Sequence, residues 1–221
     1  LSGTGATRTF LMPESNVTVT ATFKEGQPTI TVKASELDTL ETKLLEVKNS
    51  GASCITVKIT DMEDAQPAAN WSTLDIENDE DIATLMGYMD TRFSTIFDAI
   101  FEVQGELGIS MNPETGDRKM TYSGLGVKLD LSGTKLTYLP FAAFADMSGE
   151  ERGLLNLIDV KLPQSLTALL QWTFVGTGFT EITIPKNVKK IGRSAFKECK
   201  KLSKVVFKGY KCPEIDPGTT K

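Results

Sequence analysis

A recurring pattern of apolar residues in the C-terminal half of the chain constrains the fold most. Phe144, Phe174 and Phe196 each follow a leucine or isoleucine five residues earlier and another apolar residue eight residues earlier. Phe174 and Phe196 are 22 residues apart, whereas the 30-residue gap before Phe174 indicates an insertion of about eight residues near 148–153. A unit of this length cannot bury its own apolar face, so successive units must stack. We therefore expect the three phenylalanines to line up as a column.

Short strand-like runs accompany each unit of this pattern. Stacking would place them side by side as a parallel sheet, which predicts an α/β solenoid of about four short rungs. Alternation along a strand directs Ile182 and Ile184 inward and Thr183 outward. Pro163 and Pro185 directly follow their strands and end the pairing, because proline has no N–H to donate. The runs are Leu129–Leu131, Val160–Leu162, Ile182–Ile184 and Val205–Phe207.

The segment FTEITIPKNVKKIGRSAFKECKKLSKVVFKG carries a family pattern. It resembles the BspA-like (Treponema-type) leucine-rich repeat, whose units read roughly L..I.IP..V..IG..AF..C..L..I.F. The resemblance covers about residues 125–212 and implies that Cys199 is a small core residue. The preceding unit departs from the pattern, with Leu170 in place of glycine, Thr173 in place of alanine, and no cysteine. The matching residues are Ile182, Ile184, Pro185, Val188, Ile191, Gly192, Ala195, Phe196, Cys199, Leu202, Val205 and Phe207.

The start of the chain, GTGATRTFLMPESNVTVTATFKEG, carries a second resemblance. It is similar to the last strands of the Listeria–Bacteroides-type repeat modules of bacterial surface proteins, which end in F.MP...VTVTA.F. We expect residues 1–26 to be the remnant strand of such a module. Because the chain starts at Leu1 rather than Met, we also expect a mature protein or a piece of a longer array, for which a missing signal peptide is uninformative.

Residues 27–124 read as an α/β capping region in front of the repeat array at 125–221. Thr29–Lys33 and Cys54–Thr60 are rich in β-branched residues and predict strands, and Ser35 can cap a helix between them. A β-α-β unit at this point would cover the apolar end of the first rung. Residues 111–122 predict a hairpin with its turn at Pro113–Asp117.

Residues 79–107 predict a long helix that Asn78 can cap. Its apolar residues alternate in steps of four and three from Ile82 to Leu107, which is the spacing of a coiled-coil seam and would give a dimer. The alternative is that one or two helices pack this stripe against the cap and the first rung. Leu85 and Phe97 widen the stripe beyond a seam, which favours the alternative.

The composition excludes the commonest catalytic groups. The chain has no histidine, so Ser-His-Asp and Cys-His catalysis and histidine-ligated metal sites are excluded. Cys54, Cys199 and Cys212 are too few for an all-cysteine zinc site, although a Cys199–Cys212 bridge stays open. Carboxylate-only catalysis is compatible with the composition, but no pair of acids is singled out. We expect no enzymatic activity and no cofactor.

An acidic run at residues 75–81 resembles a calcium-binding loop only because acids stand at every second position, Asp75, Glu77, Asp79 and Asp81. An EF-hand loop that started at Asp75 would need glycine where Glu80 stands and glutamate where Met86 stands. Acids at a helix N-terminus also suit the helix dipole without a metal. We therefore expect no metal site.

Charge is distributed unevenly along the chain. Residues 186–221 hold 11 Lys and Arg against 3 Asp and Glu, although the whole chain has a net charge of −5. Such segments are usually solvated faces, but a basic end can also meet an acidic partner. We expect no nucleic-acid binding, because the aromatic residues in this part are committed to the core. The chain has no apolar run long enough for a transmembrane helix.

The outward face of the parallel sheet is the candidate binding surface. It offers a broad polar surface that suits contact with a protein or a glycan. The alternative is that these residues only solubilise the sheet, with opposite charges paired across strands. A register slip of one residue would invert the face. The predicted site residues are Lys128, Asp130, Asp159, Lys161, Glu181, Thr183 and Lys204.

The family resemblance implies a non-enzymatic bacterial protein that is secreted or anchored at the cell surface, as a lipoprotein for example. Its expected partners are host or bacterial surface proteins or glycans, contacted in adhesion or another protein–protein interaction. Two alternatives remain: a spacer or presentation domain within a larger surface protein, and a glycan-capture protein.

Overall fold

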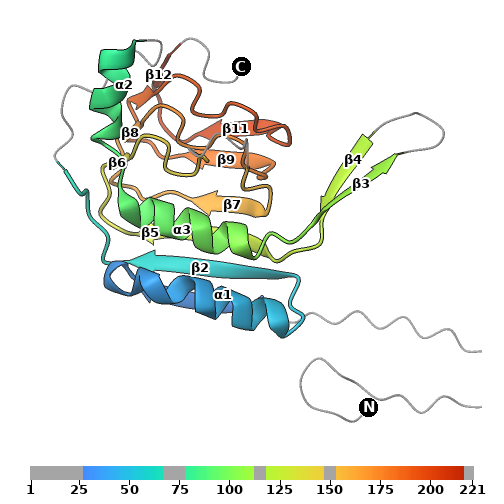
Figure 1. Ribbon diagram of the computed structural model, residues 1–221. Coiled ribbons are helices and arrows are strands. Elements are labelled where there is room, and N and C mark those ends of the chain that lie inside the picture. Colours follow the sequence, from blue (N-terminus) through green and yellow to red (C-terminus); the bar gives the residue numbers. More distant parts are fainter. Residues whose placement is uncertain (1–26, 67–77, 112–117, 147–152, 217–221) are drawn as a thin grey trace, which may run out of the picture.

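The computed structural model describes residues 27–66, 78–111, 118–146 and 153–216, which form a mixed α/β structure (Figure 1). Several sequence-based expectations fall outside these ranges. They are the module tail at residues 1–26, the acids Asp75 and Glu77, the hairpin turn at Pro113–Asp117 and most of the insertion near residues 148–153.

The described chain opens with the predicted β-α-β unit. Strands β1 (Thr29–Lys33) and β2 (Cys54–Thr60) pair in parallel, and η1 (Ala34–Thr39) and α1 (Leu40–Asn49) connect them. The predicted capping role of Ser35 is wrong. Ser35 lies inside the 3-10 turn η1, and the helix begins only at Leu40, without a side-chain cap.

Longer strands continue the parallel pairing through the repeats. β2 pairs with β5, which pairs with β7, so the first sheet has the order β1-β2-β5-β7. β9 and β11 form a separate two-stranded parallel sheet, and β9 follows β7 in Figure 1. The strands are therefore parallel, as predicted, but they divide into two sheets. These long strands are β5 (Gly126–Gly133), β7 (Leu157–Lys161), β9 (Glu181–Ile184) and β11 (Lys204–Phe207).

Each of these repeat strands is followed by a strand of two residues, which the sequence analysis missed. The short strands pair in parallel in the order β12-β10-β8-β6 and form a second ladder. The spacing of Leu139, Leu169 and Ile191 was the signal that could have identified them. The strands are β6 (Tyr138–Leu139), β8 (Ala168–Leu169), β10 (Lys190–Ile191) and β12 (Glu214–Ile215).

The phenylalanine column is confirmed. The ring centroids of Phe144 and Phe174 lie 5.4 Å apart, those of Phe174 and Phe196 lie 5.7 Å apart, and each pair is within 5° of parallel. Phe93 meets Phe144 edge-on at 5.5 Å and joins the column to the helices. The side chains of Ile182 and Ile184 are buried and Thr183 is exposed, as the alternation predicted.

Residues 79–107 do not form one long helix but two, which agrees with the alternative that the sequence favoured. The chain forms α2 (Asp79–Met86) and α3 (Thr91–Glu102), and Asp90 caps the second by accepting a hydrogen bond from the Arg92 N–H. The cap at Asn78 is confirmed, since its side chain accepts from two backbone N–H groups. The face of α3 that carries Phe93 and Ile96 is buried in the core of its own chain, so it cannot serve as a dimer seam.

A β-hairpin connects α3 to the repeat strands. β3 (Leu107–Met111) and β4 (Arg118–Tyr122) pair antiparallel, which confirms the predicted hairpin. Within the described ranges, none of the helices combines the length and apolar character that crossing a membrane requires.

Candidate binding surface

The predicted binding residues lie on the outer face of the long strands, opposite the core. The register places Lys128 opposite Asp159, and Asp130 opposite Lys161. On the second sheet, Glu181 lies opposite Lys204 and Thr183 opposite Val206. All seven predicted residues are exposed or half-buried, whereas Val127, Leu129, Val160, Ile182 and Ile184 beside them in the strands are buried.

Opposite charges pair across these strands. Lys161 Nζ lies 3.6 Å from Asp130 Oδ2, and Lys204 Nζ lies 3.1 Å from Glu181 Oε2. Lys128 Nζ donates to Gln27 Oε1 at 2.8 Å. Lys161 and both members of the Lys204–Glu181 pair are exposed, and such surface ion pairs contribute about 0–1 kcal/mol to stability. The arrangement therefore shapes the charge pattern of the face more than it holds the fold.

Asp130 is the most constrained acid of this face. Burial alone would raise its pKa, but hydrogen bonds from Ser132 and the nearby Lys161 and Lys58 outweigh burial and hold the pKa below its ordinary value. Ser132 donates both its N–H, at 2.9 Å, and its hydroxyl, at 2.5 Å. Asp130 is therefore a fixed negative charge at neutral pH.

The face extends further than the sequence analysis predicted. Thr56 and Lys58 on β2 align with Lys128 and Asp130 on β5. The alternation within Cys54–Thr60 was the signal for this extension. Helices α1 and α3 pack on the other side, where their apolar residues share one core with Ile55, Val57 and the inner residues of β5. None of the described helices covers the outer face (Figure 1).

The departures of one repeat from the family pattern have structural explanations. Leu170, in place of glycine, is fully buried in a second apolar cluster with Leu85 of α2. The Thr173 hydroxyl donates to Leu170 O at 2.7 Å. Thr177 stands where the next repeat has Cys199, and both side chains donate to Phe174 O. The unit therefore keeps its turn with different side chains.

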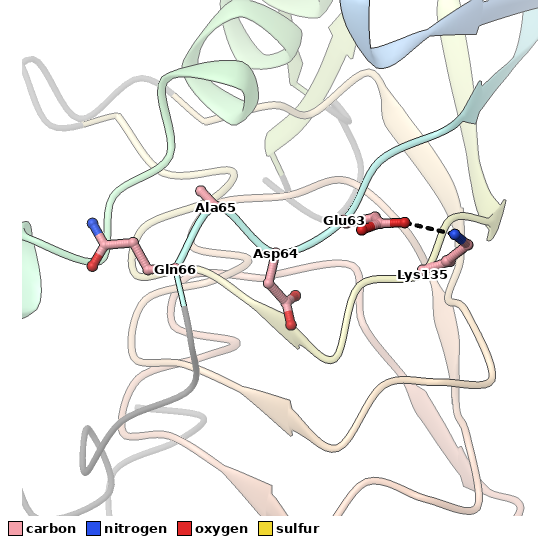
Figure 2. Close-up of a pocket in the computed structure, with 5 residues that line it drawn as sticks. All are labelled: Glu63, Asp64, Ala65, Gln66 and Lys135. Atoms are coloured by element: carbon pink, nitrogen blue, oxygen red, sulfur yellow. Dashed lines mark hydrogen bonds and ion pairs between the residues drawn. The ribbon is translucent and has the colours of Figure 1, made fainter.

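A shallow hollow of about 460 Å³ lies beside the segment that follows β2 (Figure 2). Residues 63–66 and Lys135 line it, and Lys135 Nζ lies 2.6 Å from Glu63 Oε1 at its edge. The hydrogen bond from Lys135 lowers the pKa of Glu63. Both side chains are exposed, so this is a surface ion pair.

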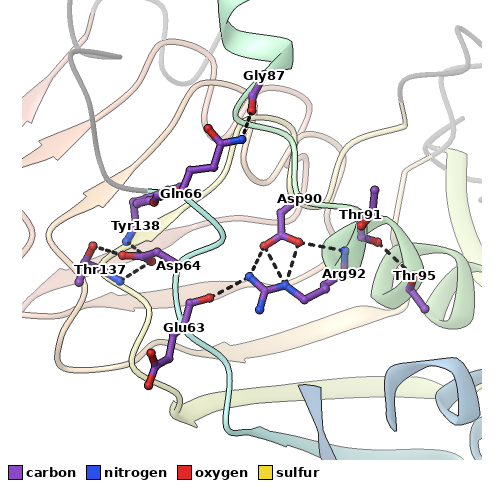
Figure 3. Close-up of polar contacts among 10 residues, drawn as sticks. All are labelled: Glu63, Asp64, Gln66, Gly87, Asp90, Thr91, Arg92, Thr95, Thr137 and Tyr138. Carbon is purple, nitrogen blue, oxygen red and sulfur yellow. Dashed lines mark hydrogen bonds and ion pairs between the residues drawn. The ribbon is translucent and has the colours of Figure 1, made fainter. Parts of the chain in front are cut away.

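Polar contacts attach this segment to the first short strand (Figure 3). The Asp64 carboxylate accepts from the Thr137 N–H at 2.8 Å and from the Thr137 hydroxyl. The Tyr138 hydroxyl donates to Gln66 O at 2.9 Å, and Gln66 Nε2 donates to Gly87 O at 2.9 Å. The segment is thereby held between β6 and α2.

Arg92 completes the network. Its guanidinium pairs with Asp90 at 2.6 Å and donates to Glu63 O at 2.8 Å. The hydrogen bond to Asp90 raises the pKa of Arg92. Burial raises the pKa of Tyr138. These polar groups are hydrogen-bonded to one another, so we interpret the network as structural: it holds the segment 63–66 in place.

The three cysteines are free thiols. Cys199 is buried and its Sγ donates to Phe174 O at 2.9 Å, whereas Cys212 is exposed, so the bridge left open by the sequence is not formed. Burial raises the pKa of the Cys199 thiol. Among the described residues, no cluster of three or more Cys, Asp or Glu side chains has the arrangement to hold a metal ion.

Each repeat contributes one long strand and one short strand, and strands of neighbouring repeats pair in parallel. This arrangement is that of a repeat protein with parallel strands. Residues 132–218 match the family model of the BspA type leucine rich repeat region in six copies, which supports a BspA-like leucine-rich repeat protein. Repeats of this family suggest a protein-interaction role and are typical of bacterial surface or secreted proteins. Comparison with curated proteins found no match, and neither did comparison with solved structures.

Proposed function

We propose that this chain is a non-enzymatic bacterial surface or secreted protein that binds other proteins in adhesion. The observation that carries the proposal is the outer face of the long strands in the sheet β1-β2-β5-β7 and in the separate sheet β11-β9, which no described helix covers. In this proposal the repeats form a short solenoid, residues 27–124 cap its first rung, and residues 1–26 are the tail of a preceding surface module.

The chemistry of the face suits a macromolecular partner. It presents threonines and charges of both signs in rows that run across the strands. One such row is Lys58 on β2, Asp130 on β5 and Lys161 on β7. A broad polar face of this kind gives specificity through charge complementarity, because a partner with the wrong pattern meets like charges. The hollow beside residues 63–66 is open and shallow, so a small molecule would stay largely exposed in it.

A binding screen against extracellular matrix proteins and a glycan array tests the proposal. The face variant Lys128→Glu/Lys161→Glu should weaken a protein hit about tenfold or more, because it places like charges on the contact. The control Lys197→Glu/Lys201→Glu makes the same charge change at exposed positions outside the face. Equal loss in both variants would reject the face as the binding surface. A saccharide hit lost only in the face variant would point to glycan capture.

A spacer or presentation domain is the second candidate function. The pairs Lys161–Asp130 and Lys204–Glu181 favour it, because a face whose charges satisfy one another needs no partner. The two candidates differ in where binding resides. Silence of this chain in every assay, together with a hit for a longer parent protein, would favour the spacer.

A further inference from the structure

A second hollow, of about 640 Å³, lies at the C-terminal end of the short-strand ladder. The loop 186–189, the segment 210–213 and Thr167 line it. This hollow is separate from the face of the long strands. The lining residues are Thr167, Lys186, Asn187, Val188, Lys189, Tyr210, Lys211, Cys212 and Pro213.

The charge of this basic hollow is of one sign. Lys186, Lys189 and Lys211 line it, and its lining includes no acid. The acids that follow in sequence pair with a lysine outside the lining: Lys190 Nζ lies 3.4 Å from Glu214 Oε1 and 3.3 Å from Asp216 Oδ1. The hollow therefore attracts an anion even though the whole chain is acidic.

Tyr210 supplies an aromatic face at the same place. Its relative exposure is 109%, the highest among the exposed large apolar residues, and no described ring packs against it. An aromatic side chain that projects from a loop stabilises no core. It does offer a flat apolar surface with a polar tip to a ligand.

The backbone around the basic hollow is held in place. The Lys189 N–H donates to Thr167 O at 2.7 Å, and the Glu214 N–H donates to Lys189 O at 2.8 Å. Asn187 Nδ2 donates to Gln164 O at 2.7 Å, and Pro213 is buried. Both loops are therefore fixed by the ladder, which lowers the ordering cost of binding.

We propose that the basic hollow binds an anionic saccharide. The lysines would pair with the carboxylate or sulfate groups, and Tyr210 would pack against the apolar C–H face of a pyranose ring. Single-stranded nucleic acid fits less well, because its binding sites use successive aromatic residues and Tyr210 is the sole aromatic of the lining. The inference does not depend on the proposed function, since it concerns another surface.

Calorimetry on the whole chain with three polysaccharides tests the inference. Heparin carries sulfate and carboxylate, polygalacturonate carries carboxylate alone, and dextran is neutral. Heparin or polygalacturonate should bind, dextran should not, and the stronger of the two acidic polymers identifies the preferred anion. Binding should weaken with added salt, because exposed charges are screened. No binding by either acidic polymer would overturn the inference.

Matched variants distinguish binding at the basic hollow from general electrostatic attraction of the polysaccharide to surface lysines. Tyr210→Ala should weaken binding about tenfold, as loss of an aromatic anchor does. Lys186→Gln/Lys189→Gln/Lys211→Gln should weaken it at least as much. The control Lys33→Gln/Lys197→Gln/Lys201→Gln removes the same charge at exposed positions outside the lining. Equal losses in the two triple variants, or no effect of Tyr210→Ala, would overturn the inference.

Cys212 gives a local readout, because it is exposed and lines the basic hollow. Heparin should slow alkylation of Cys212 several-fold and leave that of Cys54, which lies on β2, unchanged. Unaltered alkylation of Cys212 at saturating heparin would place the bound polymer elsewhere and overturn the inference. A short single-stranded oligonucleotide that protects Cys212 better than heparin would assign the hollow to nucleic acid instead.

Discussion

The carboxylate of Asp64 takes the place of a missing strand beside Thr137. From repeat to repeat, one backbone N–H of the short ladder donates to the preceding repeat: Thr167 to Thr137 O, and Lys189 to Thr167 O. Thr137 stands in the first repeat, before which the described residues include no earlier short strand of this ladder. Its N–H donates to Asp64 Oδ1 at 2.8 Å instead. Asp64 therefore satisfies the open end of this ladder.

Asp64→Ala should destabilise the protein by about 1–3 kcal/mol, because it leaves the half-buried Thr137 N–H and hydroxyl without their acceptor. Asp64→Asn should cost less, since the amide oxygen can still accept one of these hydrogen bonds. Urea unfolding of the two variants against the parent chain measures the difference.

Glu63→Ala is the matched control for Asp64→Ala. It removes a neighbouring acid whose ion pair with Lys135 is exposed, and it should leave the urea midpoint unchanged. Equal destabilisation by Glu63→Ala and Asp64→Ala would show that Asp64 acts only through its charge, and the ladder-end interpretation would then be wrong.

The structural features that the sequence predicted correctly are those that depend on the periodic spacing of apolar residues. Core positions such as Phe174 and Ile184 repeat, so their burial follows from spacing alone. The role of Asp64 has no such signal. It stands outside the repeats, and its partner Thr137 is 73 residues away along the chain. Contacts of that kind depend on how the first repeat meets the segment that follows β2, which no local pattern encodes.

The division of residues 79–107 into two helices has a local cause. The apolar spacing continues across the break between α2 and α3, although it is the face of α3 that is buried, with Phe93, Ile96 and Ile100, whereas Met86 of α2 is 50% exposed. The break itself depends on Gly87 and on Asp90, whose side chain accepts from the Arg92 N–H as an N-cap. An aspartate before a threonine was a capping signal inside the run, and the heptad interpretation passed over it.

The basic hollow could not be predicted from the sequence, since loops from different repeats form it.

Phe174 should be the most costly position in the phenylalanine column. It is fully buried, stacks on Phe144 and Phe196, and meets Phe179 edge-on at 5.4 Å. Phe174→Ala should destabilise the protein by about 3–5 kcal/mol, because it leaves a cavity between repeats. Urea unfolding measures this. Tyr210→Ala is the control for a lost aromatic ring that packs on nothing and should change stability by less than about 0.5 kcal/mol. Similar losses in the two variants would refute the stacked core.

Leu170→Gly restores the family residue and should nevertheless destabilise the protein. Leu170 is fully buried in the apolar cluster that also contains Leu85 of α2, so its loss opens a cavity in that cluster, and we expect a cost of about 3–5 kcal/mol. The smaller change Leu170→Ala avoids the added backbone freedom of glycine. In a double-mutant cycle, Leu170→Ala and Leu85→Ala should couple by about 0.5 kcal/mol or more. Additive effects would show that α2 does not depend on this contact.

Asp130 should make stability depend on pH in the acid range. Its pKa is lower in the folded chain than the ordinary 3.8, because the Ser132 hydrogen bonds and nearby lysines outweigh burial. A lowered pKa contributes stability that is complete above the unfolded value near 3.8 and is lost as the pH falls through the folded value.

The stability difference between the parent chain and Asp130→Asn should therefore be largest above about pH 5 and shrink below pH 3.8. Urea unfolding at a series of pH values measures it. Ser132→Ala removes the hydroxyl hydrogen bond and should raise the pKa of Asp130 toward its ordinary value, so the acid-dependent loss of stability should be smaller in this variant than in the parent chain and should end at a higher pH. A difference between parent and Asp130→Asn that stays constant down to pH 2 would show that the carboxylate gains nothing from Ser132 and Lys161.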